Sequence, residues 1–516
     1  MEMIGFLDRG VALGPHADCL VMGSQRWTYG QVHQLTLRIA SALHRCGARE
    51  GAKVAVLSPN DPRAFICVLG LLRAHMVWLP VNPRYVVGEI IDLLGRFSCE
   101  IAFLHSSFAP SLPLLRERLV GVRLIVGVDG SVGDAPAFEQ WLADEPAVFD
   151  APEPAPDDVA VIMATGGTTG RPKGVMQTHR GFETYIANHL ATMAHAGRPR
   201  YLLVAPMTHA AGFMCFPMLV RGGVIVVIDN AQPRTIAEAI VAHGITDLFL
   251  PPTSIYMMLA DDEVRAMRFP SLKYLLYGAA PMSTAKLREA LTVFGPVLIQ
   301  GFGQVEALML CTVLQPEDHF VDGDIASEVR LTSCGRPAPF VSVAVMAEDG
   351  KFLGDGEIGE IVVRAGNVMK GYYEDESATA ETRRYGWHHT GDLGYRDVEG
   401  YYHLVDRARD LIISGGYNIY PSQIEQVIWT HASVQDCAVV GLPHDKWGEA
   451  VTAVVELKAG FNATEAEIIA MCKSRLGSIK APKTALFWDR LPRTPVGKIS
   501  KRDIKNHFWQ AQQRRI

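Results

Sequence analysis

The chain has 516 residues, which predicts two or more domains rather than a single core. Its hydrophobic content of 48% is ordinary for a globular protein, and a net charge of −6 disfavours nucleic-acid binding, although the C-terminal tail is locally basic. Nine cysteines without a CxxC pair or a Cys/His cluster indicate reduced thiols, no zinc site and a cytoplasmic location. No signal-peptide pattern and no apolar run of about 18 residues occur, so we expect neither secretion nor a transmembrane segment.

Helices and strands are predicted to alternate from the N-terminus onward. Within residues 30–47, Val32, Leu35, Ile39 and Leu43 recur at helical spacing, and the next segment, AKVAVL, is typical of a buried strand. The same alternation predicts strands at 200–206, 224–228, 246–252 and 272–278, with helices at 235–243 and 287–295. This pattern predicts mainly parallel sheets flanked by helices, with ligands bound at loops that leave the carboxyl ends of strands.

One such loop, TGGTTGRPKG at 165–174, contains four glycines and three threonines around a single lysine. Glycines allow successive N–H groups to converge on an anion, and the hydroxyls and Lys173 add donors and positive charge, which together suit a phosphate. A polar surface turn explains the composition equally well. A Walker A loop is excluded, because Arg171 and Pro172 separate the last glycine of the loop from Lys173.

Beyond about Gly354 the pattern changes to shorter strands and turns, which predicts a small β-rich subdomain. The C-terminal segment is predicted to form two strands, a helix and a further strand. These elements are enough for a small α+β domain. The charged run DRARD at 406–410 is the candidate joint, although it could equally be a solvated turn. We therefore predict a large N-terminal domain at 1–406 and a C-terminal domain at 407–516.

Several motifs occur in one order over nearly the whole chain. They are WTYGQV, WLPVNPRY, TGGTTGRPKGVMQTH, PMTHAAG, YGAAPMS, GFGQVEA, WHHTGDLGY, DRARDLIISGGYNIYPSQIE and PRTPVGKISK. With these motifs the chain resembles the adenylate-forming superfamily of acyl-CoA synthetases, peptide-synthetase adenylation domains and luciferases. The resemblance implies that a carboxylate attacks the α-phosphorus of ATP to give an acyl adenylate, and that a thiol then displaces AMP. It also implies ATP, Mg²⁺ and CoA as cofactors and a mobile C-terminal domain.

The resemblance assigns nucleotide-binding roles to residues of several motifs. Glu306 would hold Mg²⁺, Asp392 would accept the ribose hydroxyls, and Arg407 would contact the nucleotide; taken alone, Glu306 would be a surface glutamate and Asp392 part of a glycine turn. The remaining assignments are Thr165, Gly167, Thr168, Thr169, Gly170 and Lys173 at the phosphates, and Gly278, Ala279, Ala280, Gly301, Phe302 and Gly303 around adenine.

The resemblance also assigns roles to residues of the C-terminal motifs and of the acyl site. Lys498 would bridge the carboxylate and the α-phosphate during adenylation, although an isolated lysine there would ordinarily be a solvated surface charge. Gly415 and Gly416 would leave room for the pantetheine arm of CoA in the second half-reaction, or simply form a tight turn. His209 would border the acyl site, where a lone histidine is more often part of the core.

Four positions depart from the family pattern. The usual serine is replaced by Gly166, the usual tyrosine near adenine by Phe302, a phosphate-bonding threonine by Val305, and a hinge aspartate or lysine by Arg409. A lost hydrogen bond to a charged group is worth about 1.5 to 3 kcal/mol, which slows an enzyme without necessarily abolishing its activity.

The residues around His209 are aliphatic, aromatic or small and include no obvious counter-ion for an ammonium group, which favours an apolar or aromatic acid. The leading hypothesis is therefore an acyl-CoA synthetase that acts on such an acid. Three rivals stay open: a ligase that loads a carrier protein, a non-catalytic acyl or nucleotide binder, and a luciferase-like oxygenase. The sequence leaves the acid, a homodimer and contact with a membrane surface undetermined.

Overall fold

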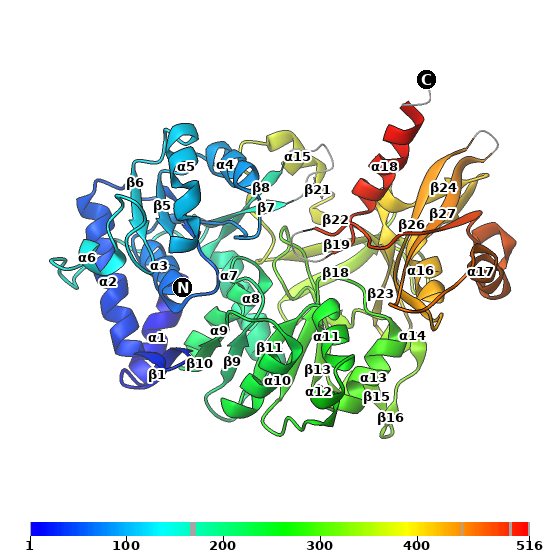
Figure 1. Ribbon diagram of the computed structural model, residues 1–516, viewed down its shortest axis with the longest axis horizontal. Helices are drawn as coiled ribbons and strands as arrows, with labels where there is room; N and C mark the ends of the chain where they lie inside the picture. Colours follow the sequence, from blue (N-terminus) through cyan, green and yellow to red (C-terminus); the bar gives the residue numbers. More distant parts are fainter. Residues whose placement is uncertain (1, 166–171, 445–446, 495–497, 514–516) are drawn as a thin grey trace.

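The structure, a computed structural model, describes residues 2–165, 172–444, 447–494 and 498–513. In Figure 1 the chain as far as β23 (Tyr402–Arg407) forms a broad body, and the orange and red C-terminal elements form a smaller lobe beside it. The body contains two large, mainly parallel sheets and one smaller antiparallel sheet, and the lobe contains a further sheet. This architecture confirms the predicted α/β fold with a β-rich subdomain and a small C-terminal α+β region.

The first large sheet has seven strands in the order β20-β8-β7-β4-β3-β5-β6. β3, β4, β5 and β6 run parallel, as the alternating pattern predicts, and β7 continues this direction beside β4. The strands are β3 (Lys53–Leu57), β4 (Val77–Pro80), β5 (Ile101–Leu104), β6 (Leu124–Gly127), β7 (Val159–Thr165), β8 (Lys173–Thr178) and β20 (Gly371–Tyr372).

The second large sheet has nine strands in the order β17-β14-β13-β12-β11-β9-β10-β1-β2. Its strands from β13 to β1 in this order are parallel, and antiparallel strands close both edges. The strands are β1 (Asp18–Met22), β2 (Gln25–Thr28), β9 (Arg200–Leu203), β10 (Val224–Val227), β11 (Asp247–Leu250), β12 (Tyr274–Gly278), β13 (Leu298–Phe302), β14 (Thr312–Leu314) and β17 (Arg336–Pro337).

Helices cover the faces of these sheets and fill the space between them (Figure 1). They are α1 (Gly5–Leu13), α2 (Tyr29–Arg45), α3 (Pro62–Arg73), α4 (Val87–Arg96), α5 (Leu112–Arg118), α6 (Phe138–Trp141), α7 (His179–Thr192), α8 (Ala210–Phe213), α9 (Cys215–Val220), α10 (Pro233–Ala242), α11 (Pro252–Leu259), α12 (Asp262–Ala266), α13 (Thr284–Phe294), α14 (Glu328–Leu331) and α15 (Glu376–Glu381). Short 3₁₀ turns, η1 (Ser106–Ser111), η2 (Glu317–His319) and η3 (Ala408–Asp410), and a small ribbon of β15 (Phe320–Val321) and β16 (Asp324–Ile325) complete the connections.

The main core lies where α2 and α3 pack between the two large sheets. α2 begins with a capping box, in which the side chains of Thr28 and Gln31 each bond the other residue's backbone N–H. α3 is apolar on nearly all sides because it contacts strands of both sheets. The two helices approach closely at Gly70, where a Cβ would lie only 2.5 Å from Ile39 Cγ2. A side chain at this glycine would push the helices apart.

The threonine- and glycine-rich segment connects β7 and β8, which are antiparallel neighbours. Thr165, the last residue of β7, lies opposite Lys173, the first residue of β8. β7 and β8 therefore form the two strands of a hairpin, and α7 begins only after β8.

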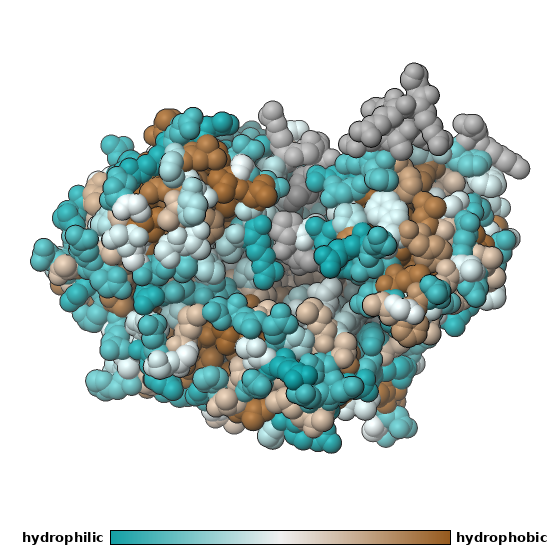
Figure 2. Space-filling model, viewed as in Figure 1, coloured by the Kyte–Doolittle hydropathy of each residue, from teal (hydrophilic) through white to brown (hydrophobic). Residues whose placement is uncertain are grey.

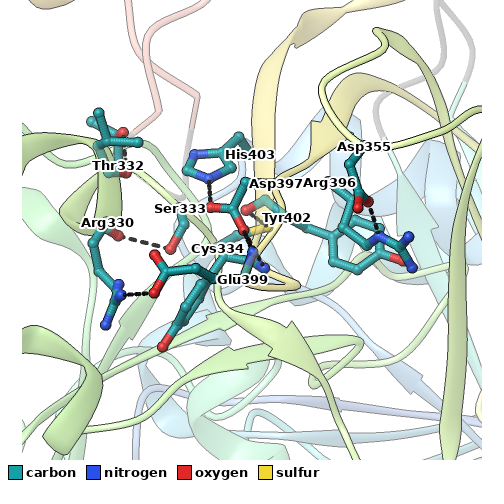
Figure 3. A network of polar contacts seen from close by, with 12 residues as sticks. Arg330, Thr332, Ser333, Cys334, Asp355, Arg396, Asp397, Glu399, Tyr402 and His403 are labelled. Carbon is teal, nitrogen blue, oxygen red and sulfur yellow. Dashed lines mark hydrogen bonds and ion pairs between the residues drawn. The ribbon is translucent and has the colours of Figure 1, made fainter.

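The small antiparallel sheet is formed by β18 (Val341–Met346), β19 (Gly359–Ala365), β21 (Arg383–Arg384), β22 (Trp387–Arg396) and β23. Polar contacts fasten the turn between β22 and β23 to the second large sheet (Figure 3). Asp397 Oδ1 accepts the backbone N–H groups of Glu399 and Tyr401, and Glu399 pairs with Arg330 Nη2 at 2.6 Å. The guanidinium of Arg336 lies 4.2 Å from the ring centroid of Tyr401. The turn thereby fixes the position of β22 on the body.

The C-terminal lobe contains a mixed sheet of its own, with helices packed against it. Its strands are β24 (Ile412–Ser414), β25 (Tyr417–Ile419), β26 (Val434–His444), β27 (Gly448–Leu457) and β28 (Thr484–Phe487), and its helices are α16 (Pro421–Trp429), α17 (Glu465–Lys480) and α18 (Lys501–Gln513). β26 and β27 are antiparallel, and β28 joins β27 in parallel after α17. The predicted succession of strand, strand, helix and strand is confirmed.

Hydrophilic residues cover most of the face shown in Figure 2, and apolar residues occur there in separate groups. Within the described ranges, none of the helices is long and apolar enough to traverse a lipid bilayer.

His189 on α7 makes stability depend on pH. Its side chain is fully buried, and neither ring nitrogen has a hydrogen-bond partner among the described residues. Burial, aided by the charge of Arg221, lowers the pKa of His189 to about 3. Between this value and the ordinary histidine pKa the unfolded chain binds a proton that the folded chain does not, so stability falls as the pH falls.

We therefore expect acidification from pH 7 to pH 5 to lower the free energy of unfolding by about 2 kcal/mol through His189 alone. Replacing the residue with neutral glutamine, His189→Gln, should remove that part of the pH dependence, as measured by urea unfolding at both pH values. The exposed His16→Gln is the control and should leave the pH dependence as in the wild type. Equal pH dependence in His189→Gln and the wild type would contradict the assignment.

Candidate active site

The predicted phosphate-binding residues lie partly outside the described structure. Gly166, Gly167, Thr168, Thr169 and Gly170 fall in the range 166–171, which the structure does not describe. Thr165 and Lys173 are described, and their register across β7 and β8 brings the two ends of the segment together.

Lys173 lies beside Tyr372, a residue from a distant part of the chain. Its Nζ lies 4.7 Å from the ring centroid of Tyr372 on β20, the neighbour of β8. The Tyr372 hydroxyl donates a hydrogen bond of 2.9 Å to Glu306 Oε1. Burial and the adjacent Glu306 carboxylate raise the pKa of Tyr372 far above its ordinary value, so this hydroxyl remains a donor. Lys173, the predicted cation, and Glu306, the predicted metal-binding carboxylate, therefore both contact Tyr372.

Val305, which replaces the expected threonine, contributes to apolar packing. It packs against a small buried cluster that includes Val175, Met369 and Tyr372. Its carbonyl oxygen accepts a 2.5 Å hydrogen bond from Gln177 Nε2. The valine therefore helps to position the chain next to Glu306.

Asp392 lies on β22 and is 5% exposed. Arg407 Nε on β23 lies 2.7 Å from its Oδ1, and Gln304 Nε2 donates to its Oδ2 at 2.6 Å. Burial raises the pKa of Asp392, and the charge of Arg407 is the largest opposing influence. An ionised carboxylate has about four lone-pair directions, so these two donors leave acceptor capacity for further hydroxyl groups.

Glu360 on β19 holds the irregular part of β22 that immediately precedes Asp392. Its Oε1 accepts the N–H of Gly391 at 2.9 Å, and its Oε2 lies 2.6 Å from His389 Nδ1 and 3.3 Å from Arg384 Nη2. Gly391 has a φ of +71°, a conformation that favours glycine. Glu360 therefore fixes a backbone conformation that the position of Asp392 depends on.

The predicted adenine-binding segments lie at the carboxyl ends of the adjacent parallel strands β12 and β13. Gly278 pairs with Gly301, and a Cβ on Gly278 would lie 2.5 Å from the Gly301 carbonyl oxygen. Ala279 has a φ of +65°, and Ala280 follows it. Phe302 is only 9% exposed and belongs to the main core, while a Cβ on Gly303 would clash with the Met309 carbonyl. The two strand ends are packed too closely for larger residues.

Lys498, in the C-terminal lobe, lies near the charged groups of Asp392, Arg407 and Glu306. Part of its surface is accessible to solvent, but burial by surrounding protein lowers its pKa, and the nearby cation Arg407 lowers it further. The charges of Asp392 and Glu306 act in the opposite direction. Its backbone N–H donates to Thr494 Oγ1 at 3.2 Å, which ties Lys498 to Thr494. The structure therefore brings Lys498 into the electrostatic range of both predicted site carboxylates.

His209 immediately precedes α8, and its Nδ1 lies 3.0 Å from Thr208 Oγ1. Burial, followed by the charge of Lys498, lowers the pKa of His209 to about 4. At neutral pH this imidazole is uncharged, so it provides no positive charge next to Lys498.

Gly415 and Gly416 form the turn between β24 and β25, with φ values of +58° and +83°. The Gly415 N–H donates to the Trp447 carbonyl within the same lobe, and both glycines are exposed. Their role toward CoA stays a prediction.

Sequence reasoning did not identify Tyr372, Gln304 or Glu360. Gln304 lies within the motif GFGQVEA, and Glu360 within the predicted strand GEIVVRAG, but no spacing in either segment relates them to Asp392. Their roles become visible only through contacts between segments 31 to 88 residues apart.

Comparison with known proteins agrees with this arrangement. A family model described as "AMP-binding enzyme" matches residues 7–373, and one described as "AMP-binding enzyme C-terminal domain" matches residues 423–498. The chain belongs to the AMP-binding enzymes. Lys498 is the last residue of the second match, and Asp392 and Arg407 lie between the two.

Individual relatives of this AMP-binding enzyme act on different acids. A medium/long-chain-fatty-acid–CoA ligase, FadD8 of Mycobacterium tuberculosis, is 34% identical over 96% of this chain and 88% of its own. A feruloyl-CoA synthase of an Amycolatopsis species is also 34% identical, over 97% of this chain and 98% of its own. The solved structure of the amide bond synthetase McbA from Marinactinospora thermotolerans has a TM-score of 0.89 and 28% identity, covering 98% of this chain and all of that one. These likenesses confirm the predicted enzyme class, an AMP-forming acid–thiol ligase.

The support of Asp392 by Glu360 can be tested through nucleotide binding. We expect Glu360→Ala to raise the KM for ATP about tenfold or more, because the Gly391 N–H loses a charged acceptor. The kcat should change less, because the lost hydrogen bond holds the residue before Asp392, which would bind the ribose rather than the reacting groups. Titration with a fluorescent ATP analogue and steady-state kinetics measure both quantities.

The control is Glu357→Ala, which removes a carboxylate that caps the separate turn at Gly354. It should bind the analogue as tightly as the wild type. Wild-type affinity in Glu360→Ala would show that Asp392 does not need this support.

Proposed function

We propose that the chain is an ATP-dependent acyl-CoA synthetase that activates an apolar or aromatic carboxylic acid. The carboxylate oxygen attacks the α-phosphorus of ATP, the bond to the β-phosphate breaks, and pyrophosphate leaves. The CoA sulfur then attacks the acyl carbon of the adenylate, AMP leaves, and the thiol proton passes to solvent. The observation that carries this proposal is the convergence of Lys173, Glu306, Asp392 and Lys498 from four separate segments.

These residues suit a reaction between two anions. Lys173 and Lys498 supply positive charge near the site where triphosphate and carboxylate would meet, and preorganised donors stabilise charge that develops on phosphoryl oxygens. Asp392 would accept the ribose hydroxyls, with Arg407 alongside. The neutral His209 next to apolar α8 supports an acid without a positively charged substituent.

The site fits Mg²⁺ bound mainly by the substrate. Among the described residues no group of three or more His, Cys, Asp or Glu side chains could hold a metal ion. Mg²⁺ commonly takes only one or two carboxylates and completes its shell with phosphate oxygens and water, so the single carboxylate of Glu306 suffices. When bound, the ion would neutralise phosphate charge.

The position of Lys498 supports an assignment of this structure to the adenylation step. We propose residues 1–406 and 407–516 as the two domains, with the joint at Arg407–Asp410. For thioester formation the smaller domain would turn about this joint and present Gly415 and Gly416 in place of Lys498.

A panel of acids tests the proposal and identifies the substrate. Fatty acids of several lengths, ferulate, benzoate and amino acids are supplied with ATP and Mg²⁺, and pyrophosphate release is measured. We expect release with an apolar or aromatic acid and no release with amino acids. Failure of every acid would favour a non-catalytic binder.

The acceptor is tested on the acid that reacts, by mass spectrometry of products with CoA, with a holo carrier protein or with an amine. We expect the CoA thioester. A carrier-bound product alone would identify a carrier-loading ligase, and an amide alone would match the reaction named for McbA.

Lys498→Ala tests the role of the C-terminal lysine. We expect acid-dependent pyrophosphate release to fall about 100- to 1000-fold, the effect of removing one preorganised donor to a developing oxyanion. Thioester formation from a supplied acyl adenylate should remain nearly unchanged. Lys473→Ala, an exposed lysine on α17, should retain both activities. A comparable loss in both half-reactions of Lys498→Ala would contradict the role.

A further inference from the structure

The end of β23 is hydrogen-bonded to the first turn of α16. Asp406 Oδ2 accepts the Ser422 N–H at 2.9 Å, and its Oδ1 accepts the Arg407 N–H at 2.8 Å. The Ser422 hydroxyl also donates to the Val405 carbonyl. The residue before α16, Tyr420, makes no side-chain cap, so Asp406 supplies an acceptor that this helix does not provide itself.

A cation of the lobe lies near the same carboxylate. Lys501 Nζ, at the start of α18, pairs with Glu425 Oε1 on α16 at 2.8 Å. Burial opposes the charge of Lys501, but Glu425 and then Asp406 outweigh it and raise its pKa. Glu425 is 6% exposed and also accepts the Val439 N–H, so the pair ties α18 to the interior of the lobe.

These contacts connect the body to the segment that carries Lys498. Asp406 belongs to β23, the neighbour of β22 and therefore of Asp392. Ser422 and Lys501 belong to the lobe, and Lys501 follows Lys498 by three residues. The position of α16 against Asp406 thereby limits where Lys498 can lie relative to Asp392.

We propose that Asp406 is a positioning residue, which holds the lobe in the adenylation orientation by binding the N-terminal turn of α16 and attracting Lys501. The inference rests on the proposed function and adds to it a residue that acts through Lys498. Turning of the lobe about Arg407–Asp410 for thioester formation would break the bond between Asp406 and Ser422. The contact therefore favours one half-reaction over the other.

The first test compares the two half-reactions in Asp406→Ala and Asp406→Asn. Adenylation is measured as acid-dependent exchange of pyrophosphate into ATP, and thioester formation is measured from supplied acyl adenylate. We expect Asp406→Ala to slow the exchange about tenfold, as for a lost hydrogen bond to a charged group, and to change thioester formation less than twofold. Asp406→Asn keeps an acceptor of the same shape and should give an intermediate loss of exchange activity. This variant still tests the proposal if Asp406→Ala does not fold.

Asp489→Asn is the control, because it removes an exposed carboxylate from the same lobe. It should behave as the wild type in both assays. Equal slowing of both half-reactions by the Asp406 variants, or no change in either, would overturn the proposal.

A second measurement does not depend on turnover. Fluorophores attached through unnatural amino acids at the exposed positions Val120 on the body and Ile479 on the lobe report the lobe orientation by energy transfer. With Mg²⁺ and a non-hydrolysable ATP analogue, we expect one dominant distance in the wild type and a second population in Asp406→Ala. An unchanged distribution would overturn the proposal. If the wild type releases no pyrophosphate with any acid, the proposed function fails, and this measurement still decides whether Asp406 holds the lobe.

Discussion

The site depends on the balance of charge around the buried carboxylate of Asp392. Burial disfavours its ionised form, and Arg407 and the amide of Gln304 offset that effect. Lys498 comes from the other lobe, and its approach places a third cation next to Arg407 and Arg409, which lower its pKa. The negative charges of a triphosphate and a carboxylate would relieve this repulsion. Closure of the lobe and binding of anionic substrates should therefore favour each other.

The charges around Asp392 stay in balance only if β22 and β23, which carry Asp392 and Arg407, keep their position relative to the large sheets. The turn at Asp397 provides one attachment, through the ion pair of Glu399 with Arg330 (Figure 3). The guanidinium of Arg330 also lies over the ring of Tyr401. Glu360 provides another attachment by holding Gly391. Both attachments use charged acceptors for backbone N–H groups, which are among the stronger hydrogen bonds in proteins. The position of Asp392 is therefore supported both from β19 and from the turn at Asp397.

Departures from the family pattern have different structural consequences. Val305 packs against Tyr372, the residue that holds Glu306, so the loss of a hydroxyl is accompanied by an apolar contact that stabilises the adjacent carboxylate. Phe302 lies mostly within the core, where a ring without a hydroxyl needs no partner. Arg409 adds positive charge near Lys498 and Asp392. Two of the departures thus preserve packing, and the third changes the electrostatics around Lys498 and Asp392.

The sequence by itself determined the family, the parallel α/β architecture and the residue types of the site, because these follow from motifs and periodicities within short segments. It predicted a strand before the threonine-rich segment but not the hairpin with β8, since strand direction depends on pairing with other strands. Only the tertiary structure decided that Tyr372 holds Glu306, that Glu360 supports Asp392 and that Asp406 meets Ser422. Those contacts join residues 66, 31 and 16 positions apart, and no local pattern encodes which distant side chains the packed sheets will bring together.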